Sequence, residues 1–155
     1  NVNDAADDED DEEIDRVLIF ATKHNLRLLA KSEIWLVDGT FKTAPSIFYQ
    51  LFVIMGTVSH AVNGKKQVSV FPLVYALLEN KREEAYKEVL EVVLQSLSDC
   101  GTEYVPPRRI MSDFELDIIN ACTKYFQWRR ILLPFSFMSE HFSKSNVITI
   151  KIIEV

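Results

Sequence analysis

The stretch Ile34-Trp35-Leu36-Val37-Asp38-Gly39-Thr40 decides how this sequence is expected to fold. Its first four residues form a short apolar run in which β-branched and aromatic side chains favour a strand. A carboxylate follows directly, and Gly39 indicates either a turn or a tight approach of the backbone to a neighbouring group. We therefore expect a central, buried strand that ends at an acidic residue.

Two further strands are expected downstream of this one. They cover residues 50–58 and 67–78, which are rich in Val, Phe, Leu and Tyr. The turn-forming pair Asn63-Gly64 lies between them. Three sequential strands with short connections predict an antiparallel meander.

The periodicity changes to helical after the meander. Residues 82–97 place their apolar side chains on one stripe, made of Tyr86, Val89, Leu90, Val93 and Leu97. Residues 109–111 are expected to form a short strand, and Ser112-Asp113 is a plausible cap for a second helix. That helix would carry Ile118, Ile119, Cys122, Tyr125 and Phe126. Three strands, a helix, a strand and a helix are typical of an RNase H-like α/β fold, in which helical crossovers add parallel strands to an antiparallel sheet.

The start of the chain reads differently. Residues 1–15 contain nine acidic side chains, so we interpret them as a disordered acidic linker at the beginning of a fragment. Ile14, Val17, Leu18 and Ala21 then recur at helical spacing, and residues 26–30 behave similarly, which predicts a short helical lead-in.

Composition permits a nucleic-acid partner without requiring one. The 155 residues, 48% hydrophobic and 26% charged, are typical of one globular domain. The net charge is −6, but without the nine acids of the linker 14 acidic residues face 17 Lys and Arg, which leaves a balance of +3. A weakly positive domain is compatible with binding to phosphate.

The remaining composition favours a soluble, intracellular protein. The two cysteines, Cys100 and Cys122, have neither zinc-ligand spacing nor the density of a secreted disulfide scaffold, so we expect ordinary thiols. No signal peptide is recognisable, and no apolar stretch approaches the roughly 18 residues that span a bilayer.

Asp38 and Asp113 are the candidate catalytic and metal-binding residues. They end two strands that are expected to be neighbours, and two like charges at that depth repel each other unless a divalent cation bridges them. Carboxylate oxygens suit Mg²⁺ or Mn²⁺, which can activate phosphoryl transfer on DNA. The alternative is purely structural: Asp38 would begin an Asp-Gly turn, and Asp113 would cap a helix.

A longer pattern bears on this choice, and it covers residues 19–126. Its parts are Trp35-Leu-Val-Asp-Gly-Thr-Phe-Lys42, Pro45, Tyr49-Gln-Leu-Phe52, Val70-Phe-Pro-Leu-Val-Tyr-Ala-Leu77, Lys81, Tyr86, Met111-Ser-Asp-Phe-Glu115 and Asn120-Ala121. In order and spacing it resembles the MULE (Mutator-like element) transposase domain of the DDE superfamily. The resemblance implies an RNase H-like core, an Asp-Asp-Glu triad whose first two members are Asp38 and Asp113, bound Mg²⁺ or Mn²⁺, transposon-end DNA as partner and a nuclear location.

The residues that carry this resemblance do not include the third acid of the triad. Glu115 lies in the first turn of a helix, where a carboxylate favourably meets the helix dipole. In the family the catalytic Glu comes from a later helix, whereas this chain departs from the family pattern after Phe126. Glu140 and Glu154 remain formal candidates.

We accordingly expect a core over residues 16–127 and a divergent segment over 128–155, which would leave the sheet incomplete at the C-terminus. Residues 148–155 alternate enough to form a strand, and Arg129-Arg130 could touch phosphate. The three histidines, His24, His60 and His141, are expected to be surface or packing residues. The chain should bind metal but lack strand transfer activity. A domesticated DNA- or protein-binding module and a functionless relic are the alternatives.

Overall fold

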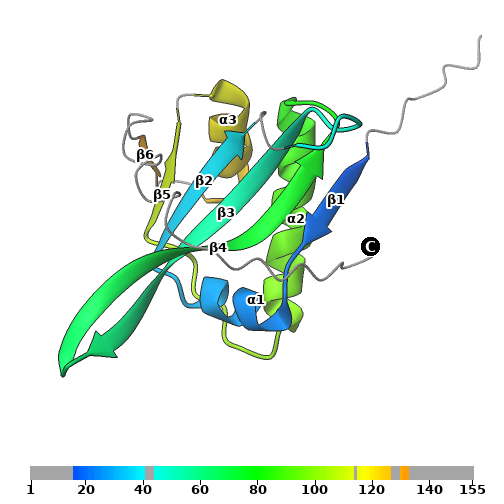
Figure 1. The fold of residues 1–155 in the computed structure, drawn as a ribbon. Coiled ribbons are helices and arrows are strands. Elements are labelled where there is room, and N and C mark those ends of the chain that lie inside the picture. The colour runs from blue at the N-terminus through cyan, green and yellow to red at the C-terminus, as the bar shows by residue number, and fades with distance from the viewer. Residues whose placement is uncertain (1–15, 41–43, 114, 127–129, 133–155) are drawn as a thin grey trace, which may run out of the picture.

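The computed structural model describes residues 16–40, 44–113, 115–126 and 130–132. Within them, six strands form one mixed sheet in the order β1-β4-β3-β2-β5-β6, accompanied by three helices (Figure 1). The strands are β1 (Val17–Phe20), β2 (Ile34–Thr40), β3 (Gln50–Val62), β4 (Lys65–Leu78), β5 (Arg109–Ser112) and β6 (Arg130–Leu132). The helices are α1 (Lys23–Ala30), α2 (Glu83–Asp99) and α3 (Leu116–Tyr125).

Strand β2 stands between the antiparallel and the parallel part of the sheet. It pairs antiparallel with β3, which pairs antiparallel with β4, so the predicted meander is confirmed. Strand β5 lies parallel to β2 on its other side, and β6 lies parallel to β5. Helices α2 and α3 make the two crossovers that parallel neighbours require. The predicted mixed α/β arrangement is therefore confirmed.

The beginning of the chain differs from the prediction. Residues 17–20 form strand β1, which pairs antiparallel with the end of β4, and not the first part of a helix. Four consecutive apolar residues fit the period of a helix and that of a strand equally well, and the pairing with the edge of β4 selects the strand. The helix starts later, where the Thr22 hydroxyl accepts a hydrogen bond of 3.0 Å from the Asn25 amide as its N-cap.

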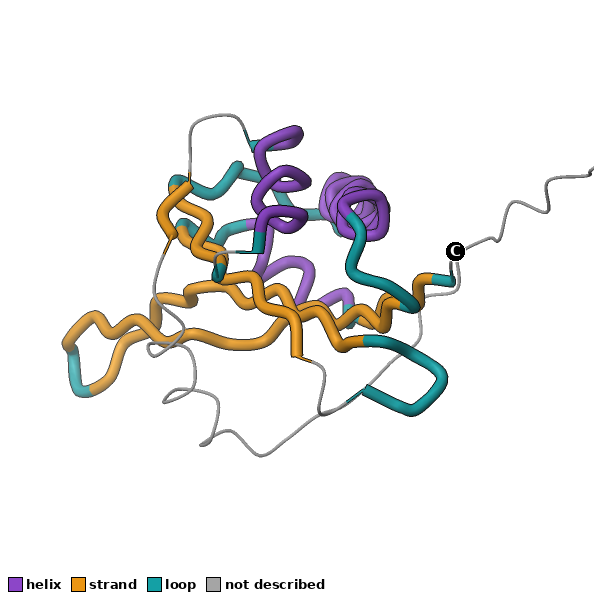
Figure 2. Tube along the Cα trace, turned by 90° about the horizontal axis from the view of Figure 1, so that it is seen from above, coloured by secondary structure: helices purple, strands orange, loops and turns teal. Residues whose placement is uncertain are grey.

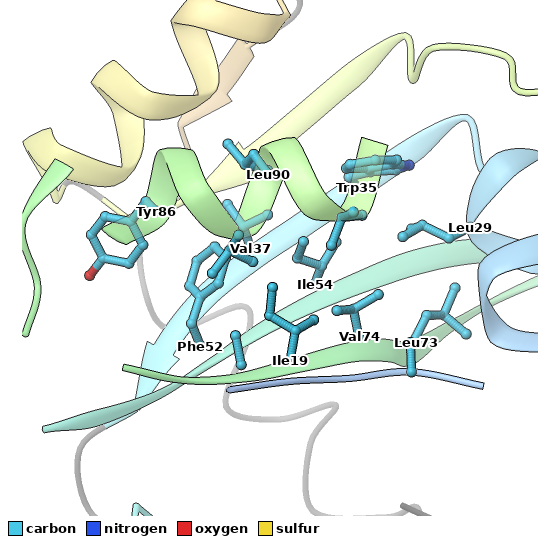
Figure 3. Close-up of a cluster of buried hydrophobic side chains, with 14 of the residues drawn as sticks. Ile19, Leu29, Trp35, Val37, Phe52, Ile54, Leu73, Val74, Tyr86 and Leu90 are labelled. Atoms are coloured by element: carbon cyan, nitrogen blue, oxygen red, sulfur yellow. The ribbon is translucent and has the colours of Figure 1, made fainter. Parts of the chain in front are cut away.

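The main core lies between the sheet and the helices, which cover one face (Figure 2). Because side chains alternate along a strand, Trp35 and Val37 of β2 point to this face, as do Phe52 and Ile54 of β3 (Figure 3). The stripe predicted for α2 is buried there, with Tyr86 completely inaccessible. A smaller cluster of Leu36, Val53 and Met55 occupies the other face.

The cysteines, two of the histidines and the end of the chain are also subjects of sequence predictions. Cys100 and Cys122 are both buried, and neither is in a disulfide within the described residues. His24 is exposed and His60 is half-buried in β3. The predicted strand at residues 148–155 lies outside the described residues, whereas β6 was not expected. No helix in the described ranges is long and apolar enough to cross a membrane.

Candidate functional site

Strands β2 and β5 bring the two predicted carboxylates to adjacent positions. Their last paired residues are Val37 and Ser112, so Asp38 and Asp113 follow as the next residues on neighbouring parallel strands. Side chains two residues apart in a strand point to the same face, so Asp38 faces the same side as Leu36, which packs in the smaller cluster on the face without helices. Asp38 thus lies within β2, and Asp113 is the first residue after the end of β5, the neighbouring strand.

The structural alternative for Asp38 is wrong. Strand β2 does not end at Asp38 but continues through Gly39 and Thr40, and Asp38 pairs with Val53 of β3. Gly39 therefore makes no turn. A Cβ at this position would lie 2.7 Å from Oε1 of Gln50, so glycine permits the tight approach that the sequence left open.

The environment of Asp38 is unfavourable for a charge. Its side chain is half-buried, and its Oδ1 is buried without a hydrogen-bond partner among the described residues. Loss of hydration is the main cause that raises the pKa of Asp38 from 3.8 to about 6, and the negative charge of Asp113 is the second. A hydrogen bond with the Gly39 backbone acts in the opposite direction, and Glu115 adds a smaller repulsion.

Asp113 does not cap helix α3, and that prediction is wrong. Glu115 is the N-cap residue, with extended backbone and no side-chain capping bond. The carboxylate of Asp113 instead accepts a hydrogen bond of 3.2 Å from the Glu115 amide. A short Asp side chain readily accepts such a bond from the amide two residues ahead.

Three polar side chains, those of Glu115, Tyr86 and Gln50, are connected by hydrogen bonds. The hydroxyl of Tyr86 donates a hydrogen bond of 2.7 Å to Oε1 of Glu115, and Nε2 of Gln50 donates one of 2.5 Å to the Tyr86 hydroxyl. Burial is the main cause that raises the pKa of Tyr86, so it stays a neutral donor. Glu115 is thus fastened to α2 at the position where α3 begins.

Gln50 and Tyr86 belong to the quoted family pattern, but sequence reasoning assigned neither of them a task at the site. Tyr86 was assigned to the apolar stripe of α2, which it does join, because its ring packs against Phe52 with centroids 5.1 Å apart. Gln50 is completely buried at the first position of β3, directly before the apolar residues 51–55. That polar residue was the available signal, since a buried amide requires partners.

The pair of carboxylates fits a divalent cation in one specific respect. Within the described ranges no group of three or more His, Cys, Asp or Glu side chains is arranged to hold a metal. Asp38 nevertheless offers a buried oxygen without a partner beside the negative charge of Asp113. A cation there would bind that oxygen and remove the repulsion, with water as its remaining ligands. Glu140, Glu154, His141, Arg129 and Arg130 lie outside the residues whose side chains are described.

The family model of the MULE transposase domain matches residues 34–138, which is more than half of the chain. The chain belongs to the MULE transposase family. No curated protein and no solved structure matches it. The resemblance expected from the sequence is thereby confirmed, and it links the domain to DNA transposition.

The match starts at the first residue of β2 and includes both Asp38 and Asp113. It continues to residue 138, beyond Phe126, where the chain was expected to leave the family pattern. Strand β1 and helix α1 precede the match, although their burial makes them part of the same core. The domain limits of 16–127 and 128–155 stay predictions.

Proposed function

We propose that this MULE domain is an RNase H-like core for phosphoryl transfer on DNA, in which Asp38 and Asp113 bind a divalent cation, Mg²⁺ or Mn²⁺. The observation that carries the proposal is the placement of two carboxylates directly after the last paired residues of parallel β2 and β5, one with a buried oxygen that lacks a hydrogen-bond partner among the described residues. The topology supports the fold assignment, because antiparallel β4, β3 and β2 are followed by parallel β5.

Each residue has a defined task in this proposal. Asp38 would supply ligand oxygens from within β2, where it pairs with Val53 of β3 and directly follows the last residue paired with β5. Asp113 would supply the second carboxylate, which its bond from the Glu115 amide holds in place. When bound, the cation would act as a Lewis acid toward a phosphodiester. The DNA ends of a transposon, in the nucleus, are the proposed substrate.

We expect weak cation binding and no robust strand transfer from these 155 residues. The described residues provide two carboxylates at the proposed site, and the nearby Glu115 already accepts a hydrogen bond from Tyr86. Oriented metal ions carry most of the charge stabilisation in such reactions, so two protein ligands leave the ion poorly held.

Thermal melting with added cation tests the site directly. Mn²⁺ at ten times its Kd should stabilise the protein by about 1.4 kcal/mol, which raises Tm by about 3–6 °C for a chain of this size. The Asp38→Asn variant should lose this shift. Asp99→Asn, which changes an exposed carboxylate at the end of α2, should keep it. Absence of a shift in the wild-type chain would reject the metal site and favour a binding module without catalysis.

A nicking assay tests the expected lack of activity. The chain is incubated with Mn²⁺ and terminal-repeat duplex DNA, and nicked products are separated on a denaturing gel. Background nicking is the expected result. Robust nicking that Asp38→Ala abolishes would contradict the expected inactivity while it supports the assignment of Asp38.

A further inference from the structure

Strands β3 and β4 extend well beyond the body of the sheet. Residues 58–69, which we call the hairpin arm, pair only with each other within the described structure, from Val58 opposite Ser69 to Val62 opposite Lys65. Every residue from 61 to 68 is exposed. Figure 1 shows the arm as a curved two-stranded ribbon that projects away from the helices, at the end of the sheet opposite the tip of β2.

The arm is a defined element and not a loose loop. Its two-residue turn has Asn63 at φ 50° and Gly64 at φ 74°, which are the left-handed conformations that suit the twist of a tight hairpin. Five consecutive residue pairs then keep the register without a shift, because the only irregularity in this pair of strands lies at Ile54/Met55. A ribbon fixed in this way can present side chains at a set distance from the core.

The charge of the arm differs from that of the rest of the chain. No acidic residue occurs from residue 39 to residue 78, although the complete chain carries a net charge of −6. Lys65 and Lys66 stand at the tip, and their cross-strand partners Val62 and Ala61 are uncharged. Neither ammonium group can therefore pair with a carboxylate inside the arm, and both are presented to solvent.

The dimensions of the arm suit double-stranded DNA. The major groove, about 12 Å wide, admits a two-stranded β-ribbon. Neighbouring residues of a strand point to opposite faces, so Lys65 and Lys66 would reach toward different walls of a groove. Polar side chains of Asn63 and Gln67 add hydrogen-bond donors beside them.

The position of the arm relative to Asp38 gives a second geometric argument. Asp38 pairs with Val53, and the tip at Val62 is nine residues farther along the same strand. At a rise of about 3.3 Å per residue this is a span of about 30 Å. One turn of B-DNA measures about 34 Å, so a duplex held at Asp38 and laid along β3 would meet the arm about one turn away.

We propose that the hairpin arm is a contact for duplex DNA, in which Lys65 and Lys66 bind backbone phosphates about one helical turn from Asp38. The inference rests on the proposed function for the identity of the partner, but it concerns a surface separate from the two carboxylates. The contact is independent of base sequence, because phosphates carry no sequence information.

The test is fluorescence anisotropy of a labelled 30-base-pair duplex of random sequence, titrated with the full chain between 50 and 200 mM salt. The double variant Lys65→Gln/Lys66→Gln removes two phosphate contacts, so the slope of log K against log salt should fall by about 1.8 in magnitude. At 0.1 M salt this corresponds to an affinity loss of about 60-fold. The matched control Lys23→Gln/Lys31→Gln removes two exposed charges of α1 and its C-cap and should bind like the wild type.

Three results would overturn the proposal. The first is equal salt slopes for the arm variant and the wild type, and the second is a wild-type chain that does not bind the duplex. The third is an arm variant whose only change is a smaller mass in sedimentation, because that result would assign the arm to contacts between copies of the chain. The cation shift in Tm is measured on the same samples. A wild-type chain that shows no cation shift but binds DNA through the arm rejects the metal site alone. A cation shift that Asp38→Asn abolishes, together with equal salt slopes for the arm variant and the wild type, rejects the arm contact alone.

Discussion

Replacement of Asp38 by Asn should stabilise the metal-free protein, and the size of the effect should depend on pH. Burial and the charge of Asp113 raise the pKa of Asp38 from 3.8 to about 6, so its ionised form is disfavoured in the folded state. This rise in the pKa of Asp38 corresponds to at most about 3 kcal/mol of free energy of unfolding. Asn has nearly the same shape and no charge, and it does not carry this cost.

The sign of this pH dependence follows from whether the folded or the unfolded chain releases the Asp38 proton at the lower pH. The unfolded chain loses the Asp38 proton near pH 4, while the folded chain keeps it until about pH 6. The stabilising contribution of protonated Asp38 is therefore complete below pH 4 and lost as the pH rises to 6. The advantage of Asp38→Asn over the wild type should grow by about 2 kcal/mol between pH 4.5 and pH 7.5.

Urea unfolding in the presence of a chelator measures this difference at both pH values. Asp99→Asn is the control, because that carboxylate is exposed and its replacement should change the free energy of unfolding equally at both pH values. If Asp38→Asn destabilises the protein by the same amount at pH 4.5 and pH 7.5, the burial argument for Asp38 is refuted. Saturating Mn²⁺ at pH 7.5 should reduce the advantage of the variant, because only the wild type gains from the cation.

Three further substitutions test the packing around the site and the arm. Tyr86→Phe removes the hydroxyl that hydrogen-bonds both Gln50 and Glu115, so it should lower the free energy of unfolding, measured in urea, by about 1–3 kcal/mol. The control Tyr125→Phe removes a long hydrogen bond of 3.4 Å to Glu91 and should change the free energy of unfolding by less than about 0.5 kcal/mol. Gly56→Ala should cost about 1–3 kcal/mol, because its Cβ would collide with Ser32 Oγ and lie 2.8 Å from Leu73 Cδ1; an unchanged Tm would contradict this. Gly64→Ala meets no atom within 4 Å but keeps a φ of +74°, so its cost should be about 1 kcal/mol and confined to the backbone; a loss as large as that of Gly56→Ala would show that the turn packs against something else.

The neighbourhood of Asp38 and Asp113 was predictable because it follows from chain order. An antiparallel meander followed by a helix returns the chain to the side of β2, so that parallel β2 and β5 have their carboxyl ends at the same edge of the sheet. The family pattern then reinforced the same two residues. The hydrogen bonds that hold Glu115 could not be predicted, because Gln50, Tyr86 and Glu115 are separated by 36 and 29 residues and meet only in the folded core.

The two errors in the strands have different causes. Residues 17–20 were assigned to a helix since four apolar residues do not define a period, and only the edge of β4 selects the strand. The hairpin arm was predicted too short, with strands ending at 58 and starting at 67, because its outer residues are small, polar or charged and show no buried face. The Asn63-Gly64 pair gave the turn correctly, since it acts through local backbone conformation.

The physical cost of Asp38 is the strongest argument for its function that does not depend on the family. A turn would explain an Asp-Gly pair, but β2 continues past it, and a helix cap would explain Asp113, but Glu115 occupies that position. With both structural tasks removed, a carboxylate with a raised pKa and a buried oxygen without a partner remains beside a second acid. If Asp38→Asn stabilises the metal-free chain as predicted, no structural task accounts for this carboxylate, and the proposed cation, which needs its charge, does.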